Sequence, residues 1–277
     1  MNSEIYITGV SGQVGGEVQR LFPHAKFITR KDLDLSSRER MEFFFKKNKP
    51  EIIVNCSAYT QVDLAEKEQE LAYAVNCVAP GILASLCNKF IHFSTDYVFN
   101  GQGFRPYVET DTTVPIGVYG QTKLAGEKAV LAANSNAVVI RSSWVYSDLG
   151  KNFVKTMLKL GSERTELKVV ADQIGSPTYA KDLAQLIVDH GIKSWNFKGG
   201  LYHFSNEGIA SWYDFAYEIM KLKGLPCKVL PIRTEDYPTP AKRPHFSVLD
   251  KTKIKNELGI TIPHWKESLE LCLQKLS

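Results

Sequence analysis

The chain lacks any long hydrophobic run. No stretch of about 18 apolar residues occurs, so no segment is expected to cross a bilayer, and the 44% hydrophobic and 23% charged content is typical of globular proteins. The first residues have no basic start and their apolar run stops at Gly9, which argues against a signal peptide. We therefore expect a cytoplasmic protein with no membrane partner.

Cysteine and histidine are sparse and scattered. The five cysteines are odd in number and show no Cys-x-x-Cys spacing, so they are expected to stay reduced. Neither they nor the six histidines cluster at metal-ligand spacing, which predicts no catalytic metal. A formal net charge of +4 is too mild to indicate nucleic acid as a partner, although it would not oppose an anionic nucleotide.

Short β-branched runs alternate with helical patterns in the amino-terminal half, which predicts an α/β fold with a doubly wound parallel sheet of the Rossmann type. Strands are expected at 5–8, 26–30, 52–55, 90–94 and 138–141, and helices at 14–21, 38–47, 66–87 and 119–133. Beyond residue 145 we expect helices at 153–160, 180–190, 212–222 and 265–276, and a strand at 201–204. The prediction is a nucleotide-binding domain over 1–145 and a smaller, interleaved substrate-binding lobe over 146–277.

A glycine-rich turn follows the first expected strand. Gly9, Gly12 and Gly15 stand where a helix should begin, so backbone N–H groups and the helix dipole would receive a pyrophosphate. A plain strand-to-helix turn also favours glycine, but the βαβ setting strengthens the case for a dinucleotide.

The residues after the second strand bear on which dinucleotide binds. An acidic residue at this point favours NAD(H), whereas arginine accommodates the 2′-phosphate of NADP(H). Here Arg30 and Lys31 predict NADPH, while Asp32 and Asp34 leave NADH open. A charged surface turn is the other interpretation of all four residues.

Tyr119 and Lys123 are four residues apart in an expected helix, and so share one face of it. An ammonium beside a phenol lowers the phenol pKa from its usual value of about 10, so Tyr119 would exchange protons near neutral pH. A single pair of this kind is usually a solvated helix face. Its occurrence downstream of Thr95 and the glycine turn instead indicates a hydride-transfer site.

Four blocks in order carry a family resemblance: the glycine turn, Asn55 to Glu66, Phe93 to Gly101, and Tyr119 to Lys123. The chain resembles the extended short-chain dehydrogenase/reductases and, within them, the dTDP-4-dehydrorhamnose reductases. The likeness continues through 141–146, 152–157, 169–178 and 243–247, and thus spans essentially the whole chain.

The resemblance implies roles for particular residues. The catalytic set would be Thr95, Tyr119 and Lys123. The cofactor would contact Gly12, Gln13 and Val14 at the pyrophosphate, Asp34 and Leu35 at the adenine end, and Ala58, Tyr59 and Thr60 beside the nicotinamide. The sugar pocket would be lined by Thr60, Val62, Asp96, Tyr97 and Trp144. Asn152 and Arg243 are candidates for the diphosphate or base, and a structural salt bridge is the other interpretation of Arg243.

The implied reaction is reduction of the 4-keto group of dTDP-4-dehydro-6-deoxy-L-mannose to dTDP-L-rhamnose. Tyr119 would donate the proton, Thr95 would orient the carbonyl, and Lys123 would hold the nicotinamide ribose. Related dehydratases carry Thr-Asp-Glu where this chain has Thr95-Asp96-Tyr97, so elimination of water would lack its base.

Two other interpretations stay open. One is a non-catalytic dinucleotide-binding subunit, like the regulatory β subunit of methionine adenosyltransferase. The other is a reductase of another 4-keto sugar nucleotide or of opposite stereochemistry at carbon 4. A monomer or a homodimer is expected; some relatives are metal-bridged dimers, but Glu17, a candidate bridging carboxylate, is expected to be solvated.

Overall fold

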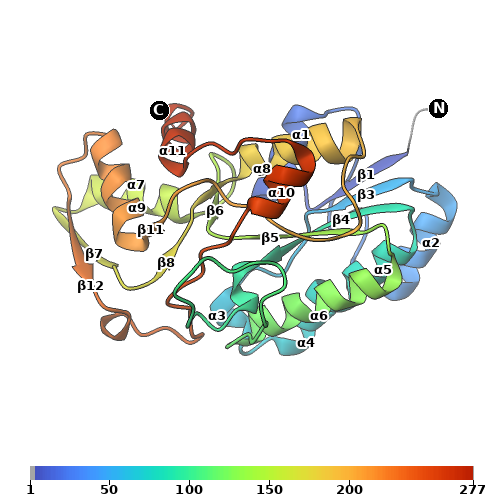
Figure 1. Ribbon diagram of the computed structural model, residues 1–277, viewed down its shortest axis with the longest axis horizontal. Coiled ribbons are helices and arrows are strands. Elements are labelled where there is room, and N and C mark those ends of the chain that lie inside the picture. The colour runs from blue at the N-terminus through green and yellow to red at the C-terminus, as the bar shows by residue number, and fades with distance from the viewer. Residues whose placement is uncertain (1–3, 277) are drawn as a thin grey trace.

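A sheet of six parallel strands forms the centre of the computed structural model, which describes residues 4–276 (Figure 1). The strand order is β10-β5-β4-β3-β1-β2. The strands are β1 (Ile5–Thr8), β2 (Lys26–Ile28), β3 (Ile52–Asn55), β4 (Lys89–Thr95), β5 (Val138–Ser142) and β10 (Gly200–His203). Because β2 and β3 lie on opposite sides of β1, the sheet is doubly wound, as predicted, and its switch point lies at the carboxyl ends of β1 and β3. The expectation that the chain has no signal peptide concerns its first residues, of which 1–3 lie outside the described range.

Helices cover both faces of this sheet and complete three layers (Figure 1). One face carries α1 (Gln13–Leu21), α8 (Ala180–Ile187) and α10 (Thr252–Leu258); the other carries α2 (Arg38–Asn48), α5 (Ala79–Ser85) and α6 (Val118–Ala133). Alternate strand residues serve the two layers, with Ile7 in the first core and Tyr6 in the second. Burial on both faces explains why these strands are nearly continuous apolar runs.

The helix predicted over 66–87 is broken into shorter pieces. After α3 (Val62–Ala65), α4 (Gln69–Tyr73) leads into a π-helical turn, η1 (Ala74–Val78), and then into α5, which ends at Ser85. A π turn accommodates an extra residue and often occurs at functional sites. Apolar periodicity does not reveal such an insertion, and so the sequence predicted one continuous helix.

The carboxyl-terminal half builds a second hydrophobic core beside the main sheet. Its helices are α7 (Phe153–Glu163), α9 (Trp212–Leu222) and α11 (Trp265–Gln274). Its strands form three pairs: β7 (Glu166–Val170) with β12 (Lys228–Ile232), β8 (Ile174–Gly175) with β11 (Ala210–Ser211), and β6 (Val145–Tyr146) with β9 (Thr178–Tyr179). Short turns complete the chain: η2 (Asp96–Val98), η3 (Val188–Lys193) and η4 (Thr234–Asp236).

Two segments from beyond residue 145 return to the main sheet. Strand β10 pairs with β5, and α8 packs against α1. The division into domains at residue 145 stays a prediction, and these returns show how closely the two halves of the chain interleave. Within residues 4–276, no helix combines the length and apolar character required to span a membrane.

Candidate functional site

The turn between β1 and α1 has the form of a dinucleotide cradle. Gly9 adopts a positive φ of 70°, and a Cβ atom there would lie 2.5 Å from the Cys56 carbonyl carbon. Gly12 is the N-cap of α1, and no side chain caps this helix. The first N–H groups of α1 therefore face the carboxyl edge of the sheet without a side-chain acceptor, and these residues fit a bound pyrophosphate.

Gln13 begins α1 and ties the cradle to the carboxyl-terminal half. Its Nε2 donates to the Val145 carbonyl at 3.2 Å, and its Oε1 accepts from Asn152 Nδ2 at 2.9 Å. Asn152 also donates to the Ser147 carbonyl at 2.6 Å and caps α7 by accepting from Lys155 N at 3.1 Å. The Asn152 side chain is thus engaged in holding α1 and α7 together.

The turn after β2 places its charged residues at the surface. Arg30 and Lys31 are exposed. Asp32 accepts from Thr29 Oγ1 at 2.6 Å and from Thr29 N at 2.8 Å, and Asp34 accepts from Ser36 N at 3.0 Å. These hydrogen bonds lower the pKa of both carboxyl groups. Both acids are therefore charged at neutral pH and occupied within the turn.

Thr95 and Tyr119 come together where β4 ends. Thr95 caps η2: its Oγ1 accepts from Tyr97 N at 3.2 Å and donates to Asp96 Oδ1 at 3.0 Å. Tyr119 lies in the first turn of α6, and its ring meets the Tyr97 ring edge-on at 5.5 Å. The close approach of α6 to η2 needs Gly120, because a Cβ atom there would lie 2.2 Å from the Tyr97 carbonyl oxygen.

The Tyr119 phenol is a weaker acid than expected from the sequence. Burial raises its pKa to about 12, the hydrogen bond with Thr95 lowers it, and the charge of Asp96 raises it further. The expectation of a lowered pKa is wrong for the polypeptide itself, because Lys123 does not direct its ammonium group at the phenol. Tyr119 therefore keeps its proton at neutral pH.

Lys123 is buried beneath the site and points to the sheet. Its Nζ donates to the Phe93 carbonyl at 2.6 Å and lies 3.3 Å from His92 Nε2. Burial lowers the Lys123 pKa to about 8, while Glu127, one turn further along α6, raises it. Glu127 is itself held by Arg141 in a buried ion pair with a 2.7 Å contact.

Asn76 contributes to the site although the sequence did not single it out. From the π turn η1, its Oδ1 accepts from Tyr59 N at 2.8 Å, and its Nδ2 donates to the Tyr59 carbonyl at 3.1 Å and to Thr122 Oγ1 at 3.2 Å. It thereby clamps the loop predicted to run beside the nicotinamide, residues 58–60, onto α6. An isolated asparagine inside a helical pattern carries no signal of this role.

Asp96 has a carboxylate oxygen available to a ligand. Its side chain is 2% exposed, and Oδ2 has no hydrogen-bond partner within residues 4–276. Burial raises the Asp96 pKa to about 6, and the hydroxyls of Ser247 and Thr95 beside the carboxylate partly oppose this shift. A buried acceptor without a partner is costly unless a ligand or water reaches it, which favours a polar ligand here.

Arg243 reaches the same region from the carboxyl-terminal half. Its two terminal nitrogens bind the Asp63 carboxylate at 2.7 and 3.1 Å, and Asp63 adjoins Val62 at the start of α3. The charge of Arg243 lowers the Tyr97 pKa and the charge of Asp63 raises it, so the ion pair lies beside the predicted sugar pocket. The structural salt bridge considered for Arg243 is therefore present.

Trp144 is placed by a strained backbone. It has a positive φ of 48°, which is unusual for a bulky residue, and its ring stacks on Trp212 with centroids 3.7 Å apart. A Cβ atom at Gly175 would lie 2.7 Å from the Trp144 ring. Strain of this kind persists where surrounding packing enforces it, often at functional sites.

Two further predictions concerned a solvated Glu17 and the absence of a metal site. Glu17 is buried, not solvated, and its carboxylate accepts a hydrogen bond from Ser147 Oγ at 2.7 Å. Across residues 4–276, no three His, Cys, Asp or Glu side chains are grouped so that they could hold a metal ion.

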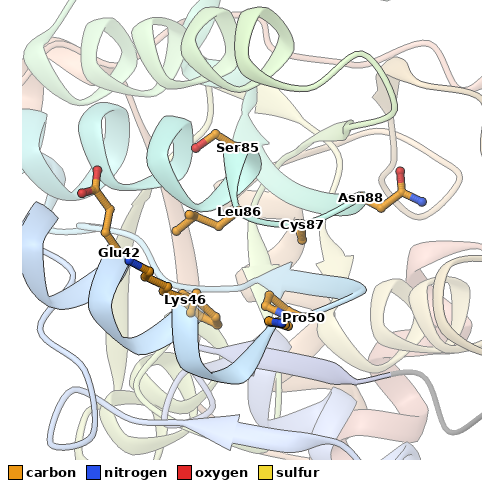
Figure 2. Close-up of a pocket in the computed structure, with 9 residues that line it drawn as sticks. Glu42, Lys46, Pro50, Ser85, Leu86, Cys87 and Asn88 are labelled. Carbon is orange, nitrogen blue, oxygen red and sulfur yellow. The ribbon is translucent and has the colours of Figure 1, made fainter.

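A hollow of about 590 Å³ lies at the opposite edge of the sheet. Figure 2 shows its lining, with Glu42 and Lys46 from α2 facing Leu86 and Cys87 beyond α5. Pro50, which also lines it, precedes β3, so this hollow lies at the amino ends of the strands. Parallel α/β sheets bind their ligands at the carboxyl ends, where the predicted residues converge, and we assign no ligand to the hollow.

Comparison with known proteins adds an independent line of evidence. The family model of the RmlD substrate binding domain matches residues 3–277. The spore coat polysaccharide biosynthesis protein SpsK of Bacillus subtilis is 41% identical over 283 residues, covering 99% of this chain and 98% of that protein.

Two solved structures are similar over nearly their whole length. A dTDP-4-dehydrorhamnose reductase from Clostridium acetobutylicum has a TM-score of 0.93 and 41% identity, covering 98% of this chain and 99% of that chain. The Bacillus anthracis dTDP-4-dehydrorhamnose reductase in complex with NADP has a TM-score of 0.92 and 36% identity, covering 99% and 100%. The resemblance predicted from the motifs is confirmed: the chain belongs to the dTDP-4-dehydrorhamnose reductase family.

Proposed function

We propose that this protein is an oxidoreductase that uses NADPH to reduce the 4-keto group of dTDP-4-dehydro-6-deoxy-L-mannose, giving dTDP-L-rhamnose. The observation that carries the proposal is the meeting of Thr95 and Tyr119 at the carboxyl end of β4, with Lys123 beneath them and the glycine cradle two strands away. The similar Bacillus anthracis reductase binds NADP, which supports the cofactor.

When bound, the cofactor would supply a hydride to carbon 4 of the sugar, and this chain would supply the proton. Because burial keeps the Tyr119 phenol protonated, Tyr119 serves as the general acid toward the carbonyl oxygen. Thr95 lies beside Tyr119, and its hydroxyl lowers the pKa of the phenol. Arg30 and Lys31, exposed after β2, would bind the 2′-phosphate that distinguishes NADPH from NADH.

The substrate side of the site would hold the sugar nucleotide. Asp96 Oδ2 offers an acceptor to a sugar hydroxyl, and the Trp144–Trp212 stack provides a flat apolar surface for the ring or base. Binding energy from the nucleotide would position the reacting carbon. We place Thr60, Val62 and Tyr97 along this pocket as part of the proposal. A cytoplasmic location and a monomeric or homodimeric state also remain predictions.

The test is to mix purified protein with dTDP-4-dehydro-6-deoxy-L-mannose and NADPH or, separately, NADH, and to follow the loss of nicotinamide absorbance while identifying the sugar formed. Accumulation of dTDP-L-rhamnose, faster with NADPH, is expected. Replacing Tyr119 by Phe should lower kcat by roughly a hundredfold to ten-thousandfold while NADPH still binds, because the acid is lost but the cradle is intact. Cofactor binding without reduction of this or any other 4-keto sugar nucleotide would favour a regulatory dinucleotide-binding subunit.

A further inference from the structure

The conspicuous block of residues that ends at Glu66 carries a carboxylate to which the proposed reaction assigns no role. Glu66 follows α3 directly and is half-buried. Its Oε1 accepts a hydrogen bond from Val118 N at 2.9 Å, although the two residues are 52 positions apart in the sequence. Val118 is the first residue of α6, and Tyr119, the proposed acid, is the second. Glu66 therefore holds the end of the helix that carries the acid.

This contact supplies a cap that α6 lacks in its own sequence. The N-cap residue of α6 is Gly117, which has no side chain to accept a hydrogen bond, and the first turn contains no acidic residue. The first N–H groups of a helix need acceptors from outside the helix, and the helix dipole makes a negative charge near them favourable. Glu66 provides both the acceptor and the charge, from a different helix.

The absence of a side chain at Gly117 leaves room for this arrangement. Gly117 has an extended backbone, with φ −147° and ψ 166°, so its conformation does not require glycine. A Cβ atom there would lie 2.9 Å from Glu66 Oε1, whereas the next nearest atom outside the adjoining residues, the Lys242 carbonyl oxygen, would be 4.0 Å away. The Glu66 carboxylate thus occupies the space of the side chain that would normally cap α6.

The helix from which Glu66 reaches α6 belongs to the substrate side of the site. Helix α3 begins with Val62, which we place along the sugar pocket, and continues with Asp63, which binds Arg243 at 2.7 Å. The hydrogen bond from Val118 to Glu66 therefore joins the segment proposed to hold the sugar to the first turn of the helix proposed to protonate it.

The second tie between this region and α6 acts further along the helix. Asn76 donates to the Tyr59 carbonyl and to Thr122, which lies one turn beyond Val118. That tie anchors the body of α6 but not its first residue. The ends of helices fray unless their first N–H groups are satisfied, so the placement of the first turn depends on Glu66.

We propose that Glu66 is a positioning residue, which caps α6 from α3 and so fixes the Tyr119 phenol relative to the sugar-binding segment. Proton transfer requires the acid within hydrogen-bond reach of the carbonyl oxygen, and a misplacement of about 1 Å can cost roughly a hundredfold in rate. The effect on catalysis rests on the proposed function, whereas the placement of Tyr119 by Glu66 does not.

The first experiment follows the Tyr119 ring by NMR in the intact protein without substrate. The ring carbon shifts of labelled tyrosine report the surroundings of the phenol, and Tyr119→Phe identifies the signal by its loss. In Glu66→Ala the Tyr119 signal should shift, whereas in Glu66→Gln it should stay near its wild-type position because the amide oxygen can still accept from Val118 N. Glu70→Ala is the matched control, since it removes an exposed carboxylate from the neighbouring helix α4. A Tyr119 signal in Glu66→Ala that coincides with that of the wild type would overturn the proposal.

The second experiment separates the placement of Tyr119 from the stability of α6. In the double variant Glu66→Ala/Gly117→Ser, the serine can cap α6 in the space that the carboxylate leaves, so the urea midpoint lost in Glu66→Ala should be restored. The helix is then capped but no longer tied to α3, so the Tyr119 signal should remain shifted. For the same reason kcat should stay roughly tenfold to a hundredfold below that of the wild type while NADPH binding is unchanged.

Return of the Tyr119 signal and of kcat together with the urea midpoint would show that any cap of α6 suffices, and the proposal would fail. A wild-type protein that reduces no 4-keto sugar nucleotide would instead contradict the proposed function. The role of Glu66 would then still be decided by the Tyr119 signal, which requires no turnover.

Discussion

Lys123 should destabilise the protein at neutral pH, and its replacement by Met should show by how much. The folded-state pKa of about 8 lies below the ordinary lysine value of 10.5, so between these pH values the unfolded chain binds more protons than the folded one. Stability therefore rises with pH through this window, and the cost of the buried amine is fully present below pH 8. Met has nearly the same length and no charge, so Lys123→Met removes this dependence.

The magnitude follows from the two pKa values. A difference of 2.5 units corresponds to roughly 3.4 kcal/mol at pH 7, and at pH 9.5 roughly 1.4 kcal/mol remains because the unfolded lysine still holds most of its proton. The wild type should thus gain about 2 kcal/mol relative to Lys123→Met between pH 7 and pH 9.5. The variant also loses the hydrogen bond to the Phe93 carbonyl, which lowers its free energy of unfolding by about 1–3 kcal/mol. This loss is the same at every pH and so does not affect the comparison.

The assay is urea unfolding of both proteins at pH 7, 8, 9 and 9.5, read from the change in midpoint at constant m-value. Lys128→Met is the matched control, since it makes the same substitution at an exposed position of the same helix, and its difference from the wild type should stay constant with pH. A difference between wild type and Lys123→Met that is equally constant would show that Lys123 has the same pKa in both states, and the burial argument would fail.

Three further substitutions test how the site is held together. Asn76→Ala should cost about 3 kcal/mol of unfolding free energy and weaken NADPH binding, because three hydrogen bonds of a buried side chain are lost; unchanged urea midpoints and NADPH titrations would contradict this. Gly120→Ala should cost about 1–3 kcal/mol and lower kcat more than tenfold as α6 is pushed from η2, whereas full activity would show that the loop yields freely. If the ion pair acts by holding Arg243 and α3 beside the pocket, Asp63→Asn should raise the substrate KM about as much as Arg243→Met does. An effect confined to Arg243→Met would instead indicate that Arg243 contacts the substrate directly.

The hydrogen-bond partners of Lys123 and Asn76 lay beyond sequence reasoning, and for Arg243 the sequence suggested a salt bridge but not that Asp63 would be its partner. Tyr119 and Lys123 were found because i and i+4 spacing is a local property of a helix. The direction of the Lys123 amine depends on a carbonyl and a histidine of β4, which lie 30 and 31 residues away in sequence and come into place only when α6 packs on the sheet. For the same reason the predicted effect on the Tyr119 pKa had the wrong sign.

Local chemistry determined the parallel sheet, the glycine cradle and the helix that carries Tyr119, because alternation, glycine conformation and helical periodicity are written within a few consecutive residues. Family membership was likewise readable from motifs spread along the chain, and the comparisons confirm it. Only the tertiary structure decided where β10 and α8 pack, that a π turn interrupts the helix at Asn76, and that Asn55 faces His92. These features depend on contacts between residues distant in sequence, whose burial and hydrogen-bond directions exist only once the layers have come together.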